Sequence, residues 1–198
     1  MQRLLGKALV RATKWTIDGG VPSAQKLVLI AAPHTSNWDF LHAMSTLYAL
    51  GLPVRWMGKN SLFRGPMGPV LRALGGIAVE RSHHGNMVQT MIDEFAKRPA
   101  LVLLVPAEGT RSAGKRWRSG FYHIARGAGV PIGLGYLDYP TKRAGIGPLL
   151  WPTGNIKDDM AHIRDFYADK VGKYPEQFTP PRLREEEEPV SPRPLRIV

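Results

Sequence analysis

The longest apolar runs of the 198-residue chain cover residues 27–33 and 100–107. Both have the length of a buried strand and fall far short of the ~20 residues that a membrane-spanning helix requires. Shorter apolar segments predict further strands, and segments with helical spacing predict helices between them. The expected strands are 26–32, 54–57, 77–79, 100–106 and 130–137, and the expected helices are 38–50, 86–97, 120–127 and 156–171, with a loop and short helix at 60–74. Strands that alternate with helices predict a single α/β domain, in which helices flank a central, mixed, mostly parallel sheet.

Residues 1–18 have the pattern of an amphipathic N-terminal helix, which Gly19, Gly20 and Pro22 end. Apolar positions share one face and basic positions the other: Leu4, Leu5, Ala8, Leu9, Ala12 and Trp15 against Arg3, Lys7, Arg11 and Lys14. One interpretation is an ordinary surface helix packed on the domain. The other is a helix in a membrane interface, with Leu and Trp at the acyl boundary and the cations facing anionic headgroups. Because charges interrupt its apolar positions, we do not expect a signal peptide.

We therefore expect three parts: the amphipathic helix in residues 1–20, a folded body in 21–174, and a tail in 175–198. Prolines and the glutamate run at 185–188 predict that the tail is extended or disordered. Its last 20 residues hold four Arg and four Glu, so the body carries the positive excess of the chain.

A net charge of +11 calls for anionic partners, which include nucleic acid, an anionic membrane, phosphorylated substrates and an acidic carrier protein. An apolar content of 43% and five Trp indicate a folded protein. The chain has no Cys, which excludes disulfides and thiolate metal sites and suits a reducing compartment. We expect a cytoplasmic location.

The segment 33–39 carries the clearest candidate for catalysis. His34 ends the first apolar run, and Asp39 follows after four residues. On one continuous helix the two would lie about 140° apart, but they can meet if His34 ends a strand and Asp39 lies in the first turn of the next helix. Thr35, Ser36 and Asn37 suit the start of such a helix. The carboxylate could then hold imidazole Nδ1–H and leave Nε2 to accept a proton, as in a general base with its orienter.

A second polar loop, 108–112, follows the second buried strand. Ligand sites in open α/β sheets gather at the carboxyl ends of strands, so the two loops are expected to meet. Gly109 permits a turn and a close ligand approach, Thr110 offers a hydroxyl, and Arg111 offers a planar fork suited to phosphate. Alone, Glu108 and Arg111 could equally be a local ion pair in a turn.

Together the two loops resemble the glycerolipid acyltransferases, the family of lysophosphatidic acid acyltransferase. That family is marked by a histidine, four residues and an aspartate, here His34 to Asp39, and by Glu-Gly-Thr-Arg in a later loop, here Glu108 to Arg111. Further blocks are similar over roughly residues 26–137: Lys59, Leu62, Phe63, Pro66, Gly68, residues 74–77 and 79–81, Gly120, Ala125 and residues 130–132. One departure is Glu80, where the family typically has aspartate.

The resemblance implies an acyltransferase that moves a fatty acyl group from an acyl thioester to the hydroxyl of a lysophospholipid, most simply 1-acyl-glycerol-3-phosphate, in phospholipid synthesis. It implies His34 as the base, Asp39 as its orienter, and acyl-CoA or acyl-carrier protein as donor, without an acyl-enzyme, bound cofactor or metal. Arg111, with Lys59 or Arg81, would hold the acceptor phosphate. Gly109 and Thr110 would complete the substrate loop, which Glu108 would buttress rather than contact phosphate itself.

Many members carry apolar N-terminal helices that enter the membrane, whereas this chain has the amphipathic segment described above. We therefore expect peripheral binding at the inner face of the cell membrane, or a more soluble acceptor. The same chemistry could serve another acceptor, such as a lyso-ornithine lipid. A basic nucleic-acid-binding module, suggested by residues 115–118, would explain the charge but leave His34 and Asp39 without a purpose. A non-catalytic lipid-binding relative is a further alternative. Within the site, His42 could compete with His34 for the Asp39 carboxylate. The adjacent histidines at 83–84 are expected to be a solvated pair rather than a metal site, because neighbouring side chains point apart.

Overall fold

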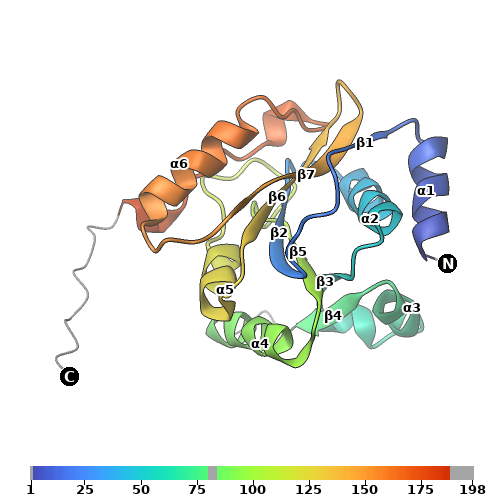
Figure 1. Ribbon diagram of the computed structural model, residues 1–198, viewed down its shortest axis with the longest axis horizontal. Helices are drawn as coiled ribbons and strands as arrows, with labels where there is room; N and C mark the ends of the chain where they lie inside the picture. The colour runs from blue at the N-terminus through green and yellow to red at the C-terminus, as the bar shows by residue number, and fades with distance from the viewer. Residues whose placement is uncertain (1, 80–83, 188–198) are drawn as a thin grey trace.

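The computed structural model describes residues 2–79 and 84–187, whose strands form one sheet in the order β1-β7-β6-β2-β5-β3-β4 (Figure 1). Neighbouring strands run parallel except for β6 and β7, which are antiparallel. The strands are β1 (Thr16–Asp18), β2 (Lys26–Ala32), β3 (Val54–Lys59), β4 (Gly76–Val79), β5 (Leu101–Val105), β6 (Ile132–Asp138) and β7 (Arg143–Leu150). The predicted α/β domain with a mixed, mostly parallel sheet is confirmed.

Helices cover both faces of this sheet (Figure 1). One face packs against α2 (Trp38–Leu50), and the other against α4 (His84–Lys97), α5 (Gly120–Ala128) and α6 (Ile156–Tyr167). The short helices η1 (Asn60–Phe63) and α3 (Gly68–Ala73) connect β3 to β4. Every residue of β5 is buried, because this strand lies between β2 and β3 with helices on both faces. Central burial explains the unbroken apolar runs of the sequence.

The N-terminal helix is shorter than expected. Helix α1 covers Gln2–Ala12, Lys14 adopts a left-handed conformation, and Thr16–Asp18 pairs with β7 as an edge strand. Thr16 and Ile17 are β-branched, and such residues favour strands over helices. Residues 16–18 therefore join the sheet, whereas the backbone N–H groups of residues 13–15 still bond to the last turns of α1.

The face of α1 that packs against the domain is also not the predicted apolar face. Gly6 and Val10 are its buried residues, and a Cβ at Gly6 would lie 2.5 Å from the backbone nitrogen of Ala49 in α2. The close approach of the two helices leaves Leu4 and Leu5 in solvent, with 74% and 50% of their surface exposed. Trp15, which the membrane interpretation places at the acyl boundary, is 8% exposed and packs inside the protein.

The chain after α6 packs against the domain. Helix α6 ends at Tyr167 rather than at residue 171, and residues 175–187 include the short helices η2 (Pro175–Gln177) and η3 (Arg184–Glu186). Thr179 and Leu183 are buried. The glutamates contact basic side chains of the body in three pairs: Glu185–His123, Glu186–Arg164 and Glu187–Arg116. The expectation of an extended or disordered tail does not hold for 175–187, because an apolar anchor and countercharges both fix it; residues 188–198 lie outside the described part.

Candidate active site

The first predicted loop has the expected geometry. His34 follows the central strand β2, Asp39 lies in the first turn of α2, and imidazole Nδ1 is 3.4 Å from Asp39 Oδ2. This separation is longer than an ordinary hydrogen bond, as is common for catalytic pairs before substrate binds. The Asp39 carboxylate is 3% exposed and the His34 side chain 16%. A buried carboxylate thus faces one ring nitrogen of a histidine that remains accessible.

The Asp39 carboxylate is held from three other directions. Its Oδ2 accepts hydrogen bonds from the backbone N–H groups of Thr35 (2.7 Å) and Ser36 (2.8 Å), and its Oδ1 accepts from the Tyr139 hydroxyl (2.5 Å). Burial alone would raise the pKa of Asp39, but hydrogen bonds from His34, Tyr139 and Ser36 offset it, so the pKa lies below its usual value. Asp39 is therefore ionised at neutral pH and can stabilise an imidazolium.

His42 does not compete for this carboxylate in the folded protein. Its ring stacks on Trp15 with centroids 4.5 Å apart, and burial lowers its pKa below the usual value despite the nearby Asp39 charge. His42 is therefore neutral at pH 7 and packs as an aromatic ring.

Glu108 braces the site from inside. Its carboxylate is almost completely buried, Oε1 accepts from the backbone N–H of His34 (2.5 Å), and Oε2 accepts from the backbone N–H of Thr179 (3.0 Å). Both oxygens are engaged by the backbone, so Glu108 is a brace between the His34 loop and the C-terminal segment. These contacts are those of a buttress for the substrate-binding loop, which is the role that the resemblance implies for Glu108.

The ionisation of Glu108 should make stability depend on pH. Burial raises its pKa to about 7, against the lowering effect of the two backbone hydrogen bonds. Between the unfolded pKa and pH 7 the folded protein holds a proton that the unfolded chain has released. The free energy of unfolding should therefore fall as pH rises through this window, by at most ~1.4 kcal/mol per pH unit and about 3 kcal/mol in all. Glu108→Gln cannot ionise and should remove this component.

Urea unfolding at pH 5, 6, 7 and 8 measures that component. Glu176→Gln, which changes an exposed carboxylate on η2, should retain the wild-type dependence. An equal pH dependence in wild type and Glu108→Gln would contradict the assignment.

The second predicted loop begins beside this brace. Gly109 has a φ of +72°, and a Cβ there would lie 2.8 Å from Arg118 Cγ, so both conformation and space require glycine. Gly109, Thr110 and Arg111 line the same cavity as His34 and Asp39, and Lys59 at the end of β3 joins them. Thr110 Oγ1 accepts from the backbone N–H of Ser112 (3.3 Å). Arg81, the other predicted cation, lies outside the described residues.

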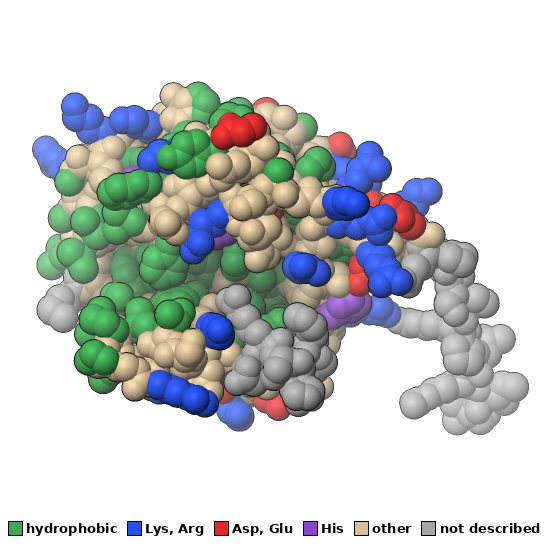
Figure 2. All heavy atoms as spheres, turned by 180° about the vertical axis from the view of Figure 1, so that it is seen from behind, with side chains coloured by type: hydrophobic (Ala, Val, Ile, Leu, Met, Phe, Trp, Pro, Cys, Tyr) green, Lys and Arg blue, Asp and Glu red, His purple; other side chains and the backbone are tan. Residues whose placement is uncertain are grey.

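The cavity has a volume of about 460 Å³, within the usual range for a small-molecule site. Figure 2 shows the hollow in this face and the hydrophobic side chains inside it. Besides these polar residues, α2, β2, β3 and β5 supply apolar lining side chains, which include Leu29, Phe40, Ala43, Leu47, Trp56 and Leu104. Thr46 also lines the cavity, and its buried hydroxyl has no hydrogen-bond partner among the described residues. A lining that combines charged and apolar side chains suits an amphiphilic substrate.

Two parts of the site were not predicted. Tyr139 follows β6, so the rule that sites lie at the carboxyl ends of strands could have identified it. The C-terminal segment carried no such signal, yet it contacts both loops. The backbone N–H of Tyr174 donates to Thr35 Oγ1 (3.2 Å), and that of Gly114 donates to Thr179 Oγ1 (2.9 Å).

Residues 2–79 and 84–187 contain no cluster of three or more His, Asp or Glu arranged to hold a metal ion. In the same ranges, no helix has both the length and the apolar character needed to cross a bilayer. The expectation of a metal-free site stays a prediction.

Comparisons with known proteins agree with the geometry. A sequence model of the family "Acyltransferase" matches residues 15–133, more than half of the chain, and this span contains both predicted loops. The crystal structure of the 1-acyl-sn-glycerophosphate (LPA) acyltransferase PlsC from Thermotoga maritima is similar, with a TM-score of 0.61 over 83% of this chain and 74% of that one. The sequence identity is 16%, so this likeness is one of fold. A comparison with curated proteins found no match. The family match, which covers most of the domain, establishes that the chain belongs to the acyltransferase family and is an acyltransferase.

Proposed function

We propose that this acyltransferase moves a fatty acyl group from acyl-CoA or acyl-carrier protein to the hydroxyl of a lysophospholipid, most simply 1-acyl-glycerol-3-phosphate. The observation that carries the proposal is the composition of one cavity. His34 and Asp39 share it with two cations, Lys59 and Arg111, and with an apolar interior. A lysophospholipid combines a hydroxyl, a phosphate and an acyl chain, and the acyl donor brings a second chain.

In this proposal the reaction is a direct transfer. His34 Nε2 takes the proton from the acceptor hydroxyl as its oxygen attacks the thioester carbonyl carbon. The new ester bond forms as the carbon–sulfur bond breaks, and the imidazolium returns the proton to the departing thiolate. Asp39 lies on the Nδ1 side and stabilises the imidazolium. The base contributes about 10²–10⁴-fold, so alignment of the two substrates must supply much of the remaining acceleration.

Arg111→Ala is expected to raise the KM for a phosphorylated acceptor about 10- to 100-fold. The reason is the loss of a charge-assisted hydrogen bond, worth roughly 1.5–3 kcal/mol. The KM for monoacylglycerol, which has the same hydroxyl and chain without phosphate, should change little. Acylation rates with both acceptors measure this difference.

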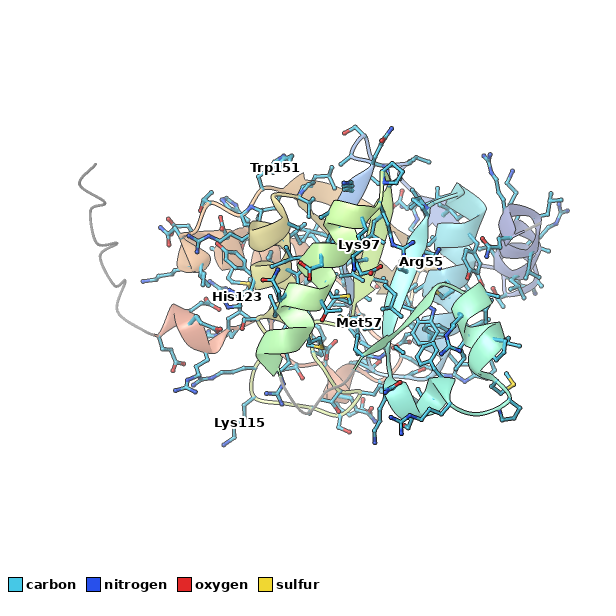
Figure 3. All side chains as sticks on the ribbon, turned by 90° about the horizontal axis from the view of Figure 1, so that it is seen from below. Arg55, Met57, Lys97, Lys115, His123 and Trp151 are labelled. Carbon is cyan, nitrogen blue, oxygen red and sulfur yellow. The ribbon has the colours of Figure 1, made fainter. Side chains whose placement is uncertain are left out.

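Lys115→Ala is the matched control for Arg111→Ala. Lys115 lies in the same loop and carries the same charge, but Figure 3 shows its side chain pointing away from the body. It should leave both KM values unchanged. Equal losses for the two acceptors with Arg111→Ala would contradict phosphate recognition and favour a role in donor binding.

Helix α1 supports a peripheral membrane position. Leu4 and Leu5 are exposed beside the basic side chains Arg3 and Lys7. An apolar patch next to cations suits the interface of an anionic bilayer. The exposed Met67 and Val70 lie at the N-cap of α3 and within α3, whose last residue Ala73 accepts a hydrogen bond from Gln2 of α1 (3.2 Å). This surface would hold the enzyme at the inner face of the cell membrane, where lysophospholipid is available.

The double substitution Leu4→Glu with Leu5→Glu is expected to abolish flotation with anionic liposomes, because it places two charges in the acyl boundary. Truncation of residues 1–18 is a poorer test, since it also removes β1 and Trp15 from the fold. Trp151→Glu changes another exposed apolar side chain, which Figure 3 shows on a different part of the surface, and should float like wild type. Full liposome binding by the double variant would contradict the proposal that α1 contacts the membrane.

The acceptor can be distinguished by assay. A panel that contains lysophosphatidic acid, a lyso-ornithine lipid and monoacylglycerol separates the proposed acceptor from the alternative. Preference for the lyso-ornithine lipid would retain the chemistry and change the substrate.

A further inference from the structure

A tyrosine hydroxyl completes the hydrogen bonding of the Asp39 carboxylate. Oδ2 accepts hydrogen bonds from the backbone N–H groups of Thr35 and Ser36 and faces His34. Oδ1 accepts a hydrogen bond from the Tyr139 hydroxyl (2.5 Å). Without Tyr139, a lone pair of a buried anion would lose its donor. The carboxylate would also lose its only restraint at Oδ1 among the described residues, and with it the fixed plane that aims Oδ2 at His34.

Tyr139 is itself held by segments that lie far apart in the sequence. Its ring contacts Trp15 edge to face, with centroids 5.0 Å apart. Trp15 in turn stacks on the ring of His42. Its backbone N–H donates to the carbonyl of Val171 (3.0 Å), which ties the β6–β7 turn to the segment after α6. Tyr139 therefore has little freedom to turn away from Asp39.

We propose that Tyr139 is a positioning residue for the His34–Asp39 pair, and that Trp15, from the N-terminal segment, holds the Tyr139 ring in the orientation that contacts Asp39. This inference rests on the proposed function, in which His34 is the base. It assigns Trp15 a role inside the catalytic unit rather than at the membrane. It also makes the N-terminal segment necessary for turnover of an acceptor that is fully dissolved in water.

The hydroxyl acts as a donor throughout the working pH range. Burial raises the pKa of Tyr139 well above its usual value, and the hydrogen bond to Asp39 and the charge of Asp39 raise it further. A protonated tyrosine keeps Asp39 ionised and fixes which oxygen faces imidazole Nδ1. When the Nδ1 proton is held there, the neutral ring presents Nε2 as the acceptor, which is the tautomer that the transfer requires.

The test compares Tyr139→Phe with Tyr122→Phe. Tyr122 of α5 makes an equivalent buried hydrogen bond to Asp159 Oδ2 (2.6 Å) on the other face of the sheet, so it controls for the loss of a hydroxyl. With a dissolved short-chain acceptor, Tyr139→Phe should lower kcat about 10- to 100-fold, the full effect of one hydrogen bond to a charged group, and leave both KM values unchanged. Tyr122→Phe should retain wild-type kcat.

A second readout does not depend on activity. Proton–nitrogen correlation spectra of protein labelled with ¹⁵N-histidine report which ring nitrogen carries the proton, and the spectrum of His34→Ala identifies the His34 signal. The neutral ring should hold its proton on Nδ1 in wild type and Tyr122→Phe, and should become a mixture of tautomers in Tyr139→Phe. Trp15→Ala should give the same change and Trp15→Phe should largely restore wild-type behaviour.

Wild-type kcat and tautomer in Tyr139→Phe would overturn the inference. If His34→Ala were inactive in the same assay, the proposed function would survive that result. If His34→Ala were fully active, the proposed function itself would fail, whatever Tyr139→Phe did.

Discussion

His34→Ala is expected to lower kcat about 100- to 10,000-fold, with the KM values for donor and acceptor within a few-fold of wild type. The substitution removes the group that takes the acceptor proton and returns it to the leaving thiolate, and general acid–base catalysis commonly contributes this factor. Lys59, Arg111 and the apolar cavity remain for binding. Steady-state kinetics with a dissolved acceptor separates kcat from KM.

The control is His162→Ala, which removes an exposed histidine on α6. It should keep wild-type kinetics, and both variants should unfold near the wild-type midpoint. A rise in KM with unchanged kcat for His34→Ala would mean that the histidine binds substrate and does not transfer protons.

Asp39→Asn is expected to lower kcat about 100- to 10,000-fold. An amide oxygen can still accept the N–H groups of Thr35 and Ser36, so the loop should keep its shape. The amide has no charge, however, and cannot stabilise the imidazolium that forms when His34 takes the proton. The loss should therefore appear in kcat, measured under saturating donor and acceptor, rather than in binding.

Asp159→Asn tests whether any loss from Asp39→Asn is merely structural. Asp159 is also buried and accepts hydrogen bonds from Tyr122 and Thr153, but it lies on α6, on the other face of the sheet. The Asp159→Asn variant should be less stable than wild type but should keep the wild-type kcat. If Asp39→Asn lost only stability while kcat stayed at the wild-type value, Asp39 would be a structural residue of the loop.

The central part of the fold was predictable because strands buried on both faces consist of apolar residues. Strands β2 and β5 are covered on both faces, and both appear as apolar runs. Strand β7 was missed, because Gly145, Gly147 and Pro148 interrupt its pattern and only its partner β6 identifies it as a strand. Edge strand β1 was assigned to a helix because Trp15, directly before it, continues the helical spacing of apolar residues, and the first helix-breaking residues after it are Gly19 and Gly20.

The two loops of the candidate site were predictable for a different reason. Their residues are unusual in type and lie directly after the two clearest strands, and parallel β2 and β5 are neighbours in the sheet. The supports of the site were harder to predict. Trp15 and Thr179 reach it only through tertiary packing, and Tyr139 was overlooked although it directly follows strand β6. A hydrogen bond across 100 positions, such as Tyr139 to Asp39, has no local pattern.

The tail shows how composition can mislead. Proline and consecutive glutamates are typical of disordered segments, and the segment alone has few apolar residues. In this protein Leu183 enters the core, and the glutamates meet countercharges that the strongly basic body supplies. Disorder is therefore a property of a segment together with its surface, which the segment alone does not reveal.

The most direct test of the central claim is transfer of a labelled acyl group from acyl-CoA and acyl-carrier protein to 1-acyl-glycerol-3-phosphate by the purified protein. The account predicts that wild type forms labelled diacylglycerol phosphate and that His34→Ala forms it at least 100-fold more slowly. Equal rates for the two proteins, or no transfer by wild type to any hydroxyl acceptor in the panel, would contradict it.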